Sequence, residues 1–305
     1  MDVGRPALAL RESPFSLAQD QPYRHWRSLK LADYPANVGA LRVRVNDPRT
    51  LSDLERRQLQ ACCSKANMVV YASDLGGLAD KDIPRRLGEQ FGMQHLDNNL
   101  LADEDAVTSL QVTPGKSGRG YIPYSNQRLS WHTDGYYNPP ERRVRAFVLH
   151  CVSPAAEGGE NALLDPEIAY ILLRDENPQH IRALMADDVL TIPANMEEEG
   201  VSRPAQTGPV FSVDPANGCL HMRYTARTRS IEWKDDSSTQ NAVQALERLL
   251  ASDSPYMFRY RLAAGEGLLC NNVLHNRTAF QDDLDKGRSR LIYRARYYDR
   301  VRGTE

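Results

Sequence analysis

Residues 121–140 read YIPYSNQRLSWHTDGYYNPP and contain the tripeptide His132-Thr133-Asp134. If this segment is a strand, residues i and i+2 project from the same face, so the His132 imidazole and the Asp134 carboxylate can reach one cation. A His-x-Asp tripeptide is common by chance in chains of this length, and alone it favours a structural or surface role. A metal site therefore requires a further ligand from elsewhere in the sequence.

The best candidate for that third ligand is His275. It follows the apolar segment 268–271, which has the pattern of a strand, and we expect His275-Asn276-Arg277 to begin a polar turn. Two imidazoles and one carboxylate on one side of a metal form the facial triad of non-haem Fe(II) oxygenases. The sequence thus allows a ferrous site with open coordination positions.

Two arginines follow this histidine within the segment RLIYR (290–294). In a strand, Arg290 and Arg294 would point to the same side. A buried guanidinium is the natural bidentate partner of a carboxylate, so this pair can bind an anionic cosubstrate near the metal. The alternative is a solvated basic strand, because three further arginines lie close by in the sequence.

Four motifs occur in the order WHTDG (131–135), GGEN (158–161), HNRTAF (275–280) and RLIYR (290–294). Together they resemble the TauD/TfdA-type Fe(II)/2-oxoglutarate-dependent dioxygenases, a family that includes taurine dioxygenase, γ-butyrobetaine hydroxylase and clavaminate synthase. The separation of 143 residues between His132 and His275 also fits this branch, which has a long insert there. The resemblance implies an α+β, mainly β fold: a double-stranded β-helix, or jelly roll, with surrounding helices and that insert.

The resemblance also implies roles for individual residues. His132, Asp134 and His275 match the catalytic iron ligands, and Arg290 matches the arginine that binds the distal carboxylate of 2-oxoglutarate. Asn161 takes the position of a residue that hydrogen-bonds the same carboxylate. Halogenating relatives have a small residue in place of the carboxylate at Asp134, so halogenation is disfavoured.

The expected cofactors are Fe(II), 2-oxoglutarate as cosubstrate, and O2. The expected reaction is the oxidation, most often hydroxylation, of an unactivated C–H bond in a small polar or anionic metabolite, with release of succinate and CO2. Two alternatives stay open at this point. One is a metal-binding protein of the same fold without turnover, and the other is a zinc hydrolase that uses a metal-bound water.

Substrate contacts are assigned to three residues. Arg128 precedes His132 by four positions, Tyr137 follows it by five, and Arg294 matches a position near 2-oxoglutarate or the substrate in relatives. Arg128 with Arg294 would favour a carboxylate, sulfonate or phosphonate, whereas tyrosines such as Tyr136, Tyr137 and Tyr224 would favour a quaternary ammonium group. An exposed Arg128 and a core Tyr137 remain the alternative.

Composition limits the partners. The 305-residue chain has 38 Lys+Arg against 40 Asp+Glu, a net charge of -2, so we expect neither a nucleic acid nor a membrane as partner. A small-molecule substrate is the expected partner. We find no run of ~20 apolar residues and no signal-peptide pattern, which makes a cytoplasmic location the default. Five cysteines without a C-x-x-C pair indicate buried thiols rather than disulfides or a zinc knuckle.

The chain divides at about residue 40. Residues 1–40 contain four prolines and little periodicity, and we expect an irregular N-terminal arm that is compatible with a homodimer or homotetramer. Many short strands separated by turns follow, with several amphipathic helices. Residues 41–305 are therefore expected to form a single jelly-roll dioxygenase domain.

Overall fold

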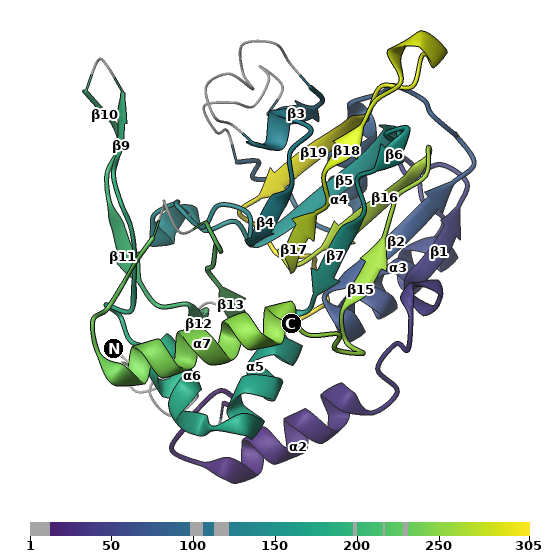
Figure 1. Cartoon of the computed structure of the whole chain (residues 1–305). Helices are drawn as coiled ribbons and strands as arrows, with labels where there is room; N and C mark the ends of the chain where they lie inside the picture. Colours follow the sequence, from purple (N-terminus) through teal and green to yellow (C-terminus); the bar gives the residue numbers. More distant parts are fainter. Residues whose placement is uncertain (1–12, 98–105, 113–121, 198–199, 216, 228–230) are drawn as a thin grey trace, which may run out of the picture. The chain divides into compact units, whose positions relative to one another are not determined.

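The fold is described by a computed structural model (Figure 1). The structure describes residues 13–97, 106–112, 122–197, 200–215, 217–227 and 231–305. Contacts between residues divide the chain into two compact units. The first unit comprises Met1–Tyr34, Asp165–Tyr256 and Glu305, and the second comprises Pro35–Leu164 and Met257–Thr304. Both units draw on residues 41–305, and the single domain expected there stays a prediction.

The second unit contains a six-stranded sheet in the order β1-β2-β16-β5-β19-β3. Strands β1 and β2 are parallel, and all the other neighbours in this sheet are antiparallel. The strands are β1 (Arg42–Val45), β2 (Met68–Ser73), β3 (Val107–Leu110), β5 (Ala146–Ser153), β16 (Glu266–Cys270) and β19 (Leu291–Tyr297). The central strands β16 and β5 are apolar along nearly their whole length, as expected for strands that are covered on both faces.

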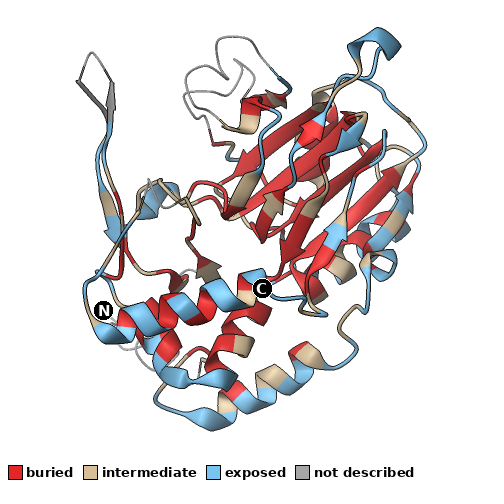
Figure 2. Ribbon diagram, viewed as in Figure 1, coloured by how far each residue is buried: buried red, intermediate tan, exposed pale blue. Residues whose placement is uncertain are grey.

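Two helices pack against this sheet, α3 (Asp53–Ala66) and α4 (Asp82–Gln90). The helix α3 begins with the capping box that Ser52 and Glu55 predict, because each side chain accepts a hydrogen bond from the backbone N–H of the other residue. Leu59 of α3 and Leu87 of α4 join Leu269 of β16 in one buried apolar core. Figure 2 shows how burial is concentrated on the strands of this unit.

A four-stranded antiparallel sheet in the order β15-β7-β17-β4 forms the other layer of this unit (Figure 1). Its strands are β4 (Leu129–His132), β7 (Asn161–Leu164), β15 (Phe258–Tyr260) and β17 (Leu274–Arg277), beside the short ribbon β6 (Glu157–Gly158) and β18 (Phe280–Gln281). The expectation of a polar turn at 275–277 is wrong, since β7 and β4 pair with these residues on both sides. The rings of Phe147 from β5 and His275 from β17 lie 5.0 Å apart, so the two sheets meet at the site.

The first unit is built from helices and small sheets. Its helices are α2 (Asp20–Leu31), α5 (Pro166–Glu176), α6 (Pro178–Leu184) and α7 (Ser237–Ala251). One sheet has the order β11-β8-β14, and two hairpins pair β10 with β9 and β12 with β13. These strands are β8 (Leu190–Ile192), β9 (Asn195–Glu197), β10 (Gly200–Arg203), β11 (Gln206–Gly208), β12 (Phe211–Val213), β13 (Leu220–Met222) and β14 (Glu232–Trp233).

The expectation of an irregular arm over residues 1–40 is wrong for α2. The helix is held by long-range contacts that composition does not reveal: the buried Lys30 Nζ lies 2.8 Å from Asp165 and 2.5 Å from Glu167. The Arg174 guanidinium also lies over the Tyr23 ring, 3.8 Å from its centroid. Residues 1–12 of the expected arm lie outside the described residues.

Four short 3-10 helices complete the secondary structure of the described residues. They are η1 (Val38–Leu41), η3 (Ile122–Tyr124), η4 (Pro140–Arg142) and η6 (Leu284–Lys286). The fold is therefore mixed α/β. No helix within the described part of the chain has the length and apolar character to span a membrane.

Candidate active site

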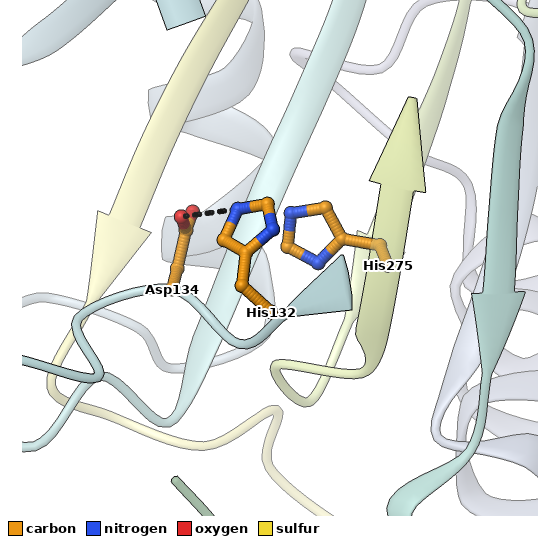
Figure 3. A group of neighbouring side chains, drawn as sticks. All are labelled: His132, Asp134 and His275. Atoms are coloured by element: carbon orange, nitrogen blue, oxygen red, sulfur yellow. Dashed lines mark ion pairs between the residues drawn. The ribbon is translucent and has the colours of Figure 1, made fainter. Parts of the chain in front are cut away.

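His132, Asp134 and His275 come together between the two sheets (Figure 3). His132 ends β4, and the antiparallel register places His275 of β17 directly opposite it. One ligand atom from each of the three side chains lies within 4.8 Å of the others. All three are buried, with exposed fractions of 7%, 5% and 7%. The pairing of β4 with β17 thus joins residues that are far apart in the sequence.

Both imidazoles have their Nδ1 atoms committed to backbone carbonyls of their own strands. The Nδ1 of His132 lies 2.9 Å from the carbonyl oxygen of Ser130, and the Nδ1 of His275 lies 2.9 Å from that of Val273. A carbonyl oxygen only accepts, so each Nδ1 must carry the proton. The lone pair is then on Nε2 of both rings, the arrangement that a metal ligand needs.

The backbone around Asp134 is fixed by a single asparagine. The N–H of Asp134 donates to Oδ1 of Asn272 at 2.8 Å. The Nδ2 of Asn272 donates to the carbonyl oxygens of Asp134 at 2.9 Å and of Val144 at 2.7 Å. Gly135 follows with φ of +67°, a left-handed conformation that glycine adopts without strain. These contacts set the direction in which the carboxylate leaves the chain.

The charge states of the triad suit metal binding. Burial lowers the pKa of His132 to about 3, and the neighbouring His275 lowers it further. Burial likewise lowers the pKa of His275. Burial raises the pKa of Asp134, but the positive charges of Arg294 and Arg296 outweigh that effect and hold it below its usual value. At neutral pH the site therefore offers two neutral imidazoles and one carboxylate.

Two arginines from β19 serve as the counter-charges of that carboxylate. The Nη1 of Arg294 lies 3.0 and 3.2 Å from the two oxygens of Asp134. The Nη1 of Arg296 lies 4.0 Å from Oδ1 of Asp134 and donates to the Tyr137 hydroxyl at 3.1 Å. Arg296 also forms an ion pair with the buried Asp97. Sequence reasoning missed Arg296 and Asp97, although the period-two spacing of 294 and 296 indicates a shared face.

Arg290 and Asn161 line one pocket of the second unit, together with Arg261 and several apolar side chains. Arg290 is buried, and its Nη1 donates to the Leu110 carbonyl at 3.4 Å. Burial lowers the pKa of Arg290 to about 10, so the guanidinium stays protonated at neutral pH. The structure therefore joins two residues that the sequence assigned to the same carboxylate.

The residues assigned to substrate binding fall in different places. Arg128 is exposed and makes no hydrogen bond or ion pair within the described part of the chain. The Tyr136 ring stands edge-on to His132 at 6.5 Å and to Tyr137 at 5.1 Å. Tyr224 belongs to the first unit and is buried there. Arg294 contacts Asp134 directly, Tyr136 contacts His132, and Tyr137 is linked to the triad through Tyr136 and Arg296.

The donor set fits a divalent first-row metal. Two imidazoles and one carboxylate without a thiolate are the ligands of non-haem Fe(II) sites. The Nδ1–carbonyl bonds satisfy the requirement that histidine ligands be oriented by a second partner. His132, Asp134 and His275 can thus hold such a metal through Nε2 and carboxylate oxygen atoms.

Comparison with known proteins gives consistent matches. The family model described as "Taurine catabolism dioxygenase TauD, TfdA family" matches residues 30–296. A uridine-5'-phosphate dioxygenase from Amycolatopsis sp is 32% identical over 267 residues, covering 74% of this chain and 93% of the relative. One from Streptomyces sp is 30% identical over 205 residues, covering 64% and 71%. An asparagine oxygenase solved with Fe(II), 2S,3S-3-hydroxyasparagine and succinate superposes with a TM-score of 0.57 at 15% identity, covering 97% of this chain and 92% of that one.

Proposed function

The chain belongs to the TauD/TfdA family of dioxygenases, and from that premise we propose that His132, Asp134 and His275 form the iron site of an oxygenase that acts on a nucleoside 5'-phosphate. The family and the curated dioxygenase relatives make the chain an Fe(II)/2-oxoglutarate-dependent oxygenase of a small metabolite. The observation that carries the site assignment is the pair of imidazoles whose Nδ1 protons are held by carbonyl oxygens. Two histidines with only a structural role in the core would not need this arrangement beside a buried carboxylate.

The substrate class is inferred from the relatives. Both curated proteins have the name uridine-5'-phosphate dioxygenase, and one of them is matched over 93% of its length. A phosphate monoester requires cationic or hydrogen-bonding groups, and Arg294 beside the triad is a suitable guanidinium. We assign Arg294, Tyr137 and Arg128 to substrate binding. The alternative role for Arg294 is to bind 2-oxoglutarate.

The jelly roll belongs to the same proposal. The sheet β15-β7-β17-β4 and the antiparallel part of the larger sheet have the strand pairings of two facing layers. The contact between Phe147 and His275 supports an interior that contains the site. The segment between β7 and β15 would be the long insert that separates the two metal histidines. A homodimer or homotetramer stays a prediction.

The chain's own residues would divide the work. The Nε2 atoms of His132 and His275 and an oxygen of Asp134 would hold Fe(II), and Arg290 with Asn161 would bind the distal carboxylate of 2-oxoglutarate. Bound Fe(II) with 2-oxoglutarate and O2 would supply the oxidation of an unreactive C–H bond, with succinate and CO2 as co-products. The burial of His132, Asp134 and His275 would limit the access of water to the triad.

The family match disfavours the two open alternatives. A zinc hydrolase would not need the buried Arg290 and Asn161 at one pocket. A pure metal binder would not need either of them. The comparisons instead favour turnover with an organic cosubstrate.

The test is substrate-stimulated succinate formation. Iron-loaded protein is incubated with 2-oxoglutarate and O2 plus UMP, AMP, uridine or taurine, and succinate is measured. We expect a nucleoside monophosphate to raise the rate well above that without substrate, and uridine to fail because it lacks the phosphate. Stimulation by taurine alone would overturn the nucleotide assignment and keep the oxygenase. No succinate under any condition from folded, iron-loaded protein would overturn the function itself.

A further inference from the structure

Arg277 and Arg290 are two buried guanidiniums beside the same aromatic ring. Arg277 ends β17, and Arg290 immediately precedes β19. The guanidinium carbon of Arg277 lies 4.8 Å from the centroid of the Phe280 ring, and that of Arg290 lies 5.1 Å from it. The two side chains are 3% and 6% exposed. Two like charges therefore share one small buried region.

The strand register brings Arg277 to the pocket residue Asn161. In the pairing of β17 with β7, Arg277 is opposite Asn161 and His275 is opposite Leu163. Residues directly opposite each other project from the same face of a sheet, with Cβ atoms about 5 Å apart. Arg277 and His275 are two residues apart on one strand and share that face. Arg277 is thus a neighbour of Asn161 and of Arg290, the two polar residues assigned to the cosubstrate carboxylate.

Neither guanidinium forms an ion pair with a carboxylate of the described residues, and the nearest carboxylate to Arg290, Asp282, accepts its backbone N–H at 2.9 Å. The Nη2 of Arg277 donates to the carbonyl oxygens of Ser125 at 2.9 Å and Gln127 at 2.6 Å, and its buried Nε has no partner there. Arg290 donates to a carbonyl oxygen as well. Carbonyl dipoles satisfy protons but do not cancel a full charge. Two buried charges without an ion-pair partner cost folding free energy, and an anion bound beside them recovers part of that cost.

We propose that Arg277 is a positioning and selectivity residue that gives the Arg290 pocket a second positive charge, and that it favours 2-oxo acids with a distal carboxylate over those without one. This inference rests on the proposed function, because it assumes that the pocket takes the cosubstrate. Arg277 acts through its charge, while Arg290 makes the direct contact.

A purely structural Arg277 is the competing explanation, since its bonds to Ser125 and Gln127 join the segment before β4 to β17. Charge and geometry are separable by substitution. Arg277→Lys keeps the charge but cannot reproduce the planar fork, whereas Arg277→Gln removes the charge and keeps a hydrogen-bond donor. If the charge of Arg277 matters, Arg277→Lys should behave like the unmodified protein and Arg277→Gln should not. If only the shape of the side chain matters, the lysine variant should be impaired as well.

The experiment measures the binding of two ligands to Co(II)-loaded protein by calorimetry. The ligands are 2-oxoglutarate and 2-oxopentanoate, which has the same chain length and ends in a methyl group. Arg290→Gln is the positive control, because it removes the direct contact. Arg223→Gln is the matched negative control, because Arg223 also donates to backbone carbonyls, those of Leu190 and Gly208 among them. Circular dichroism confirms that each variant is folded.

We expect Arg277→Gln to weaken 2-oxoglutarate binding about tenfold or more and to change 2-oxopentanoate binding less than about threefold. Arg277→Lys should stay within about threefold of the unmodified protein for both ligands. Equal weakening of both ligands, or a lysine variant as poor as the glutamine variant, would overturn the inference and leave the proposed function intact. An unmodified protein that binds neither ligand would overturn the cosubstrate assignment itself.

Discussion

A single guanidinium nitrogen, Nη1 of Arg294, contacts both carboxylate oxygens of Asp134, at 3.0 and 3.2 Å. This contact keeps a buried carboxylate ionised, because the positive charge favours the anion that burial disfavours. An ionised Asp134 is the form that a metal requires. The pairing of Arg294 with Asp134 therefore links the pH range of metal binding to an arginine that is not itself a ligand.

The first prediction follows from that pairing. Arg294→Met should raise the pKa of Asp134, so that protons compete with the metal at a higher pH than in the unmodified protein. The ratio of Co(II) affinity at pH 7 to that at pH 5 should be larger in the variant than in the unmodified protein. Burial is the main cause of the lowered pKa of both His132 and His275, and Arg294 is a smaller one. Equal ratios in the two proteins would show that Arg294 does not set the charge of Asp134.

The second prediction concerns the third ligand. His275→Ala should abolish stoichiometric Co(II) binding and lower succinate formation by more than about a hundredfold, because among the described residues only His275 joins His132 and Asp134 as a further possible ligand. His95→Ala is the control, since His95 is exposed and its ring bonds Asp299 rather than the triad. Metal content by mass spectrometry and succinate by chromatography provide the readout. Comparable metal content in the two variants would remove His275 from the site.

The third prediction is a pH dependence of stability. His150 is fully buried, bonds the Tyr71 hydroxyl at 3.0 Å, and has its pKa lowered by burial to about 4. Between that value and about 6.5 the unfolded chain binds more protons, so the stabilising contribution is complete above pH 6.5 and is lost as pH falls towards 4.

Urea unfolding tests this directly. From pH 7 to pH 5, the unmodified protein should lose about 2 kcal/mol more unfolding free energy than His150→Asn, whose side chain does not titrate. Asparagine keeps a polar group near the Tyr71 hydroxyl, so the variant should still fold. Equal losses of unfolding free energy in the two proteins would mean that His150 does not take up a proton when the chain unfolds.

The fourth prediction tests the packing of the larger sheet. A Cβ at Gly267 in β16 would overlap the carbonyl oxygen of Leu149 and the Tyr71 ring. Gly267→Ala should therefore cost about 3 kcal/mol of unfolding free energy. Gly208→Ala is the control, because its Cβ would meet only the end of the Arg223 side chain at an ordinary 3.7 Å. Thermal unfolding compares the two, and equal midpoints would contradict the close approach.

The sequence allowed much of the site to be predicted, for an identifiable reason. The spacing of His132 and Asp134 predicted their proximity, although β4 ends at His132 and Asp134 lies in the turn that follows, and motif order supplied His275, Asn161 and Arg290. These choices depend on local periodicity or on a resemblance over most of the chain. The triad geometry agrees with them, although its assignment to iron stays a proposal.

The features that sequence reasoning missed all depend on distant pairing. The segment at 275–277 is polar in composition, yet it is an inner strand because β4 and β7 flank it. Lys30 makes α2 possible only through Asp165 and Glu167, far along the chain. The ion pair of Arg296 with Asp97 likewise depends on the topology of the fold, which sequence periodicity and composition do not reveal.

The bonds from each ring Nδ1 to a carbonyl two residues earlier on its own strand have a thermodynamic consequence. Most protein sites must shed protons when they take up a metal, and the heat of uptake then includes the ionisation of the buffer. Here the Nε2 atoms of both histidines are already unprotonated, and the Asp134 carboxylate is already charged, once the chain has folded. Metal uptake at neutral pH should be proton-silent, with the same calorimetric heat in phosphate-free buffers of very different ionisation enthalpy.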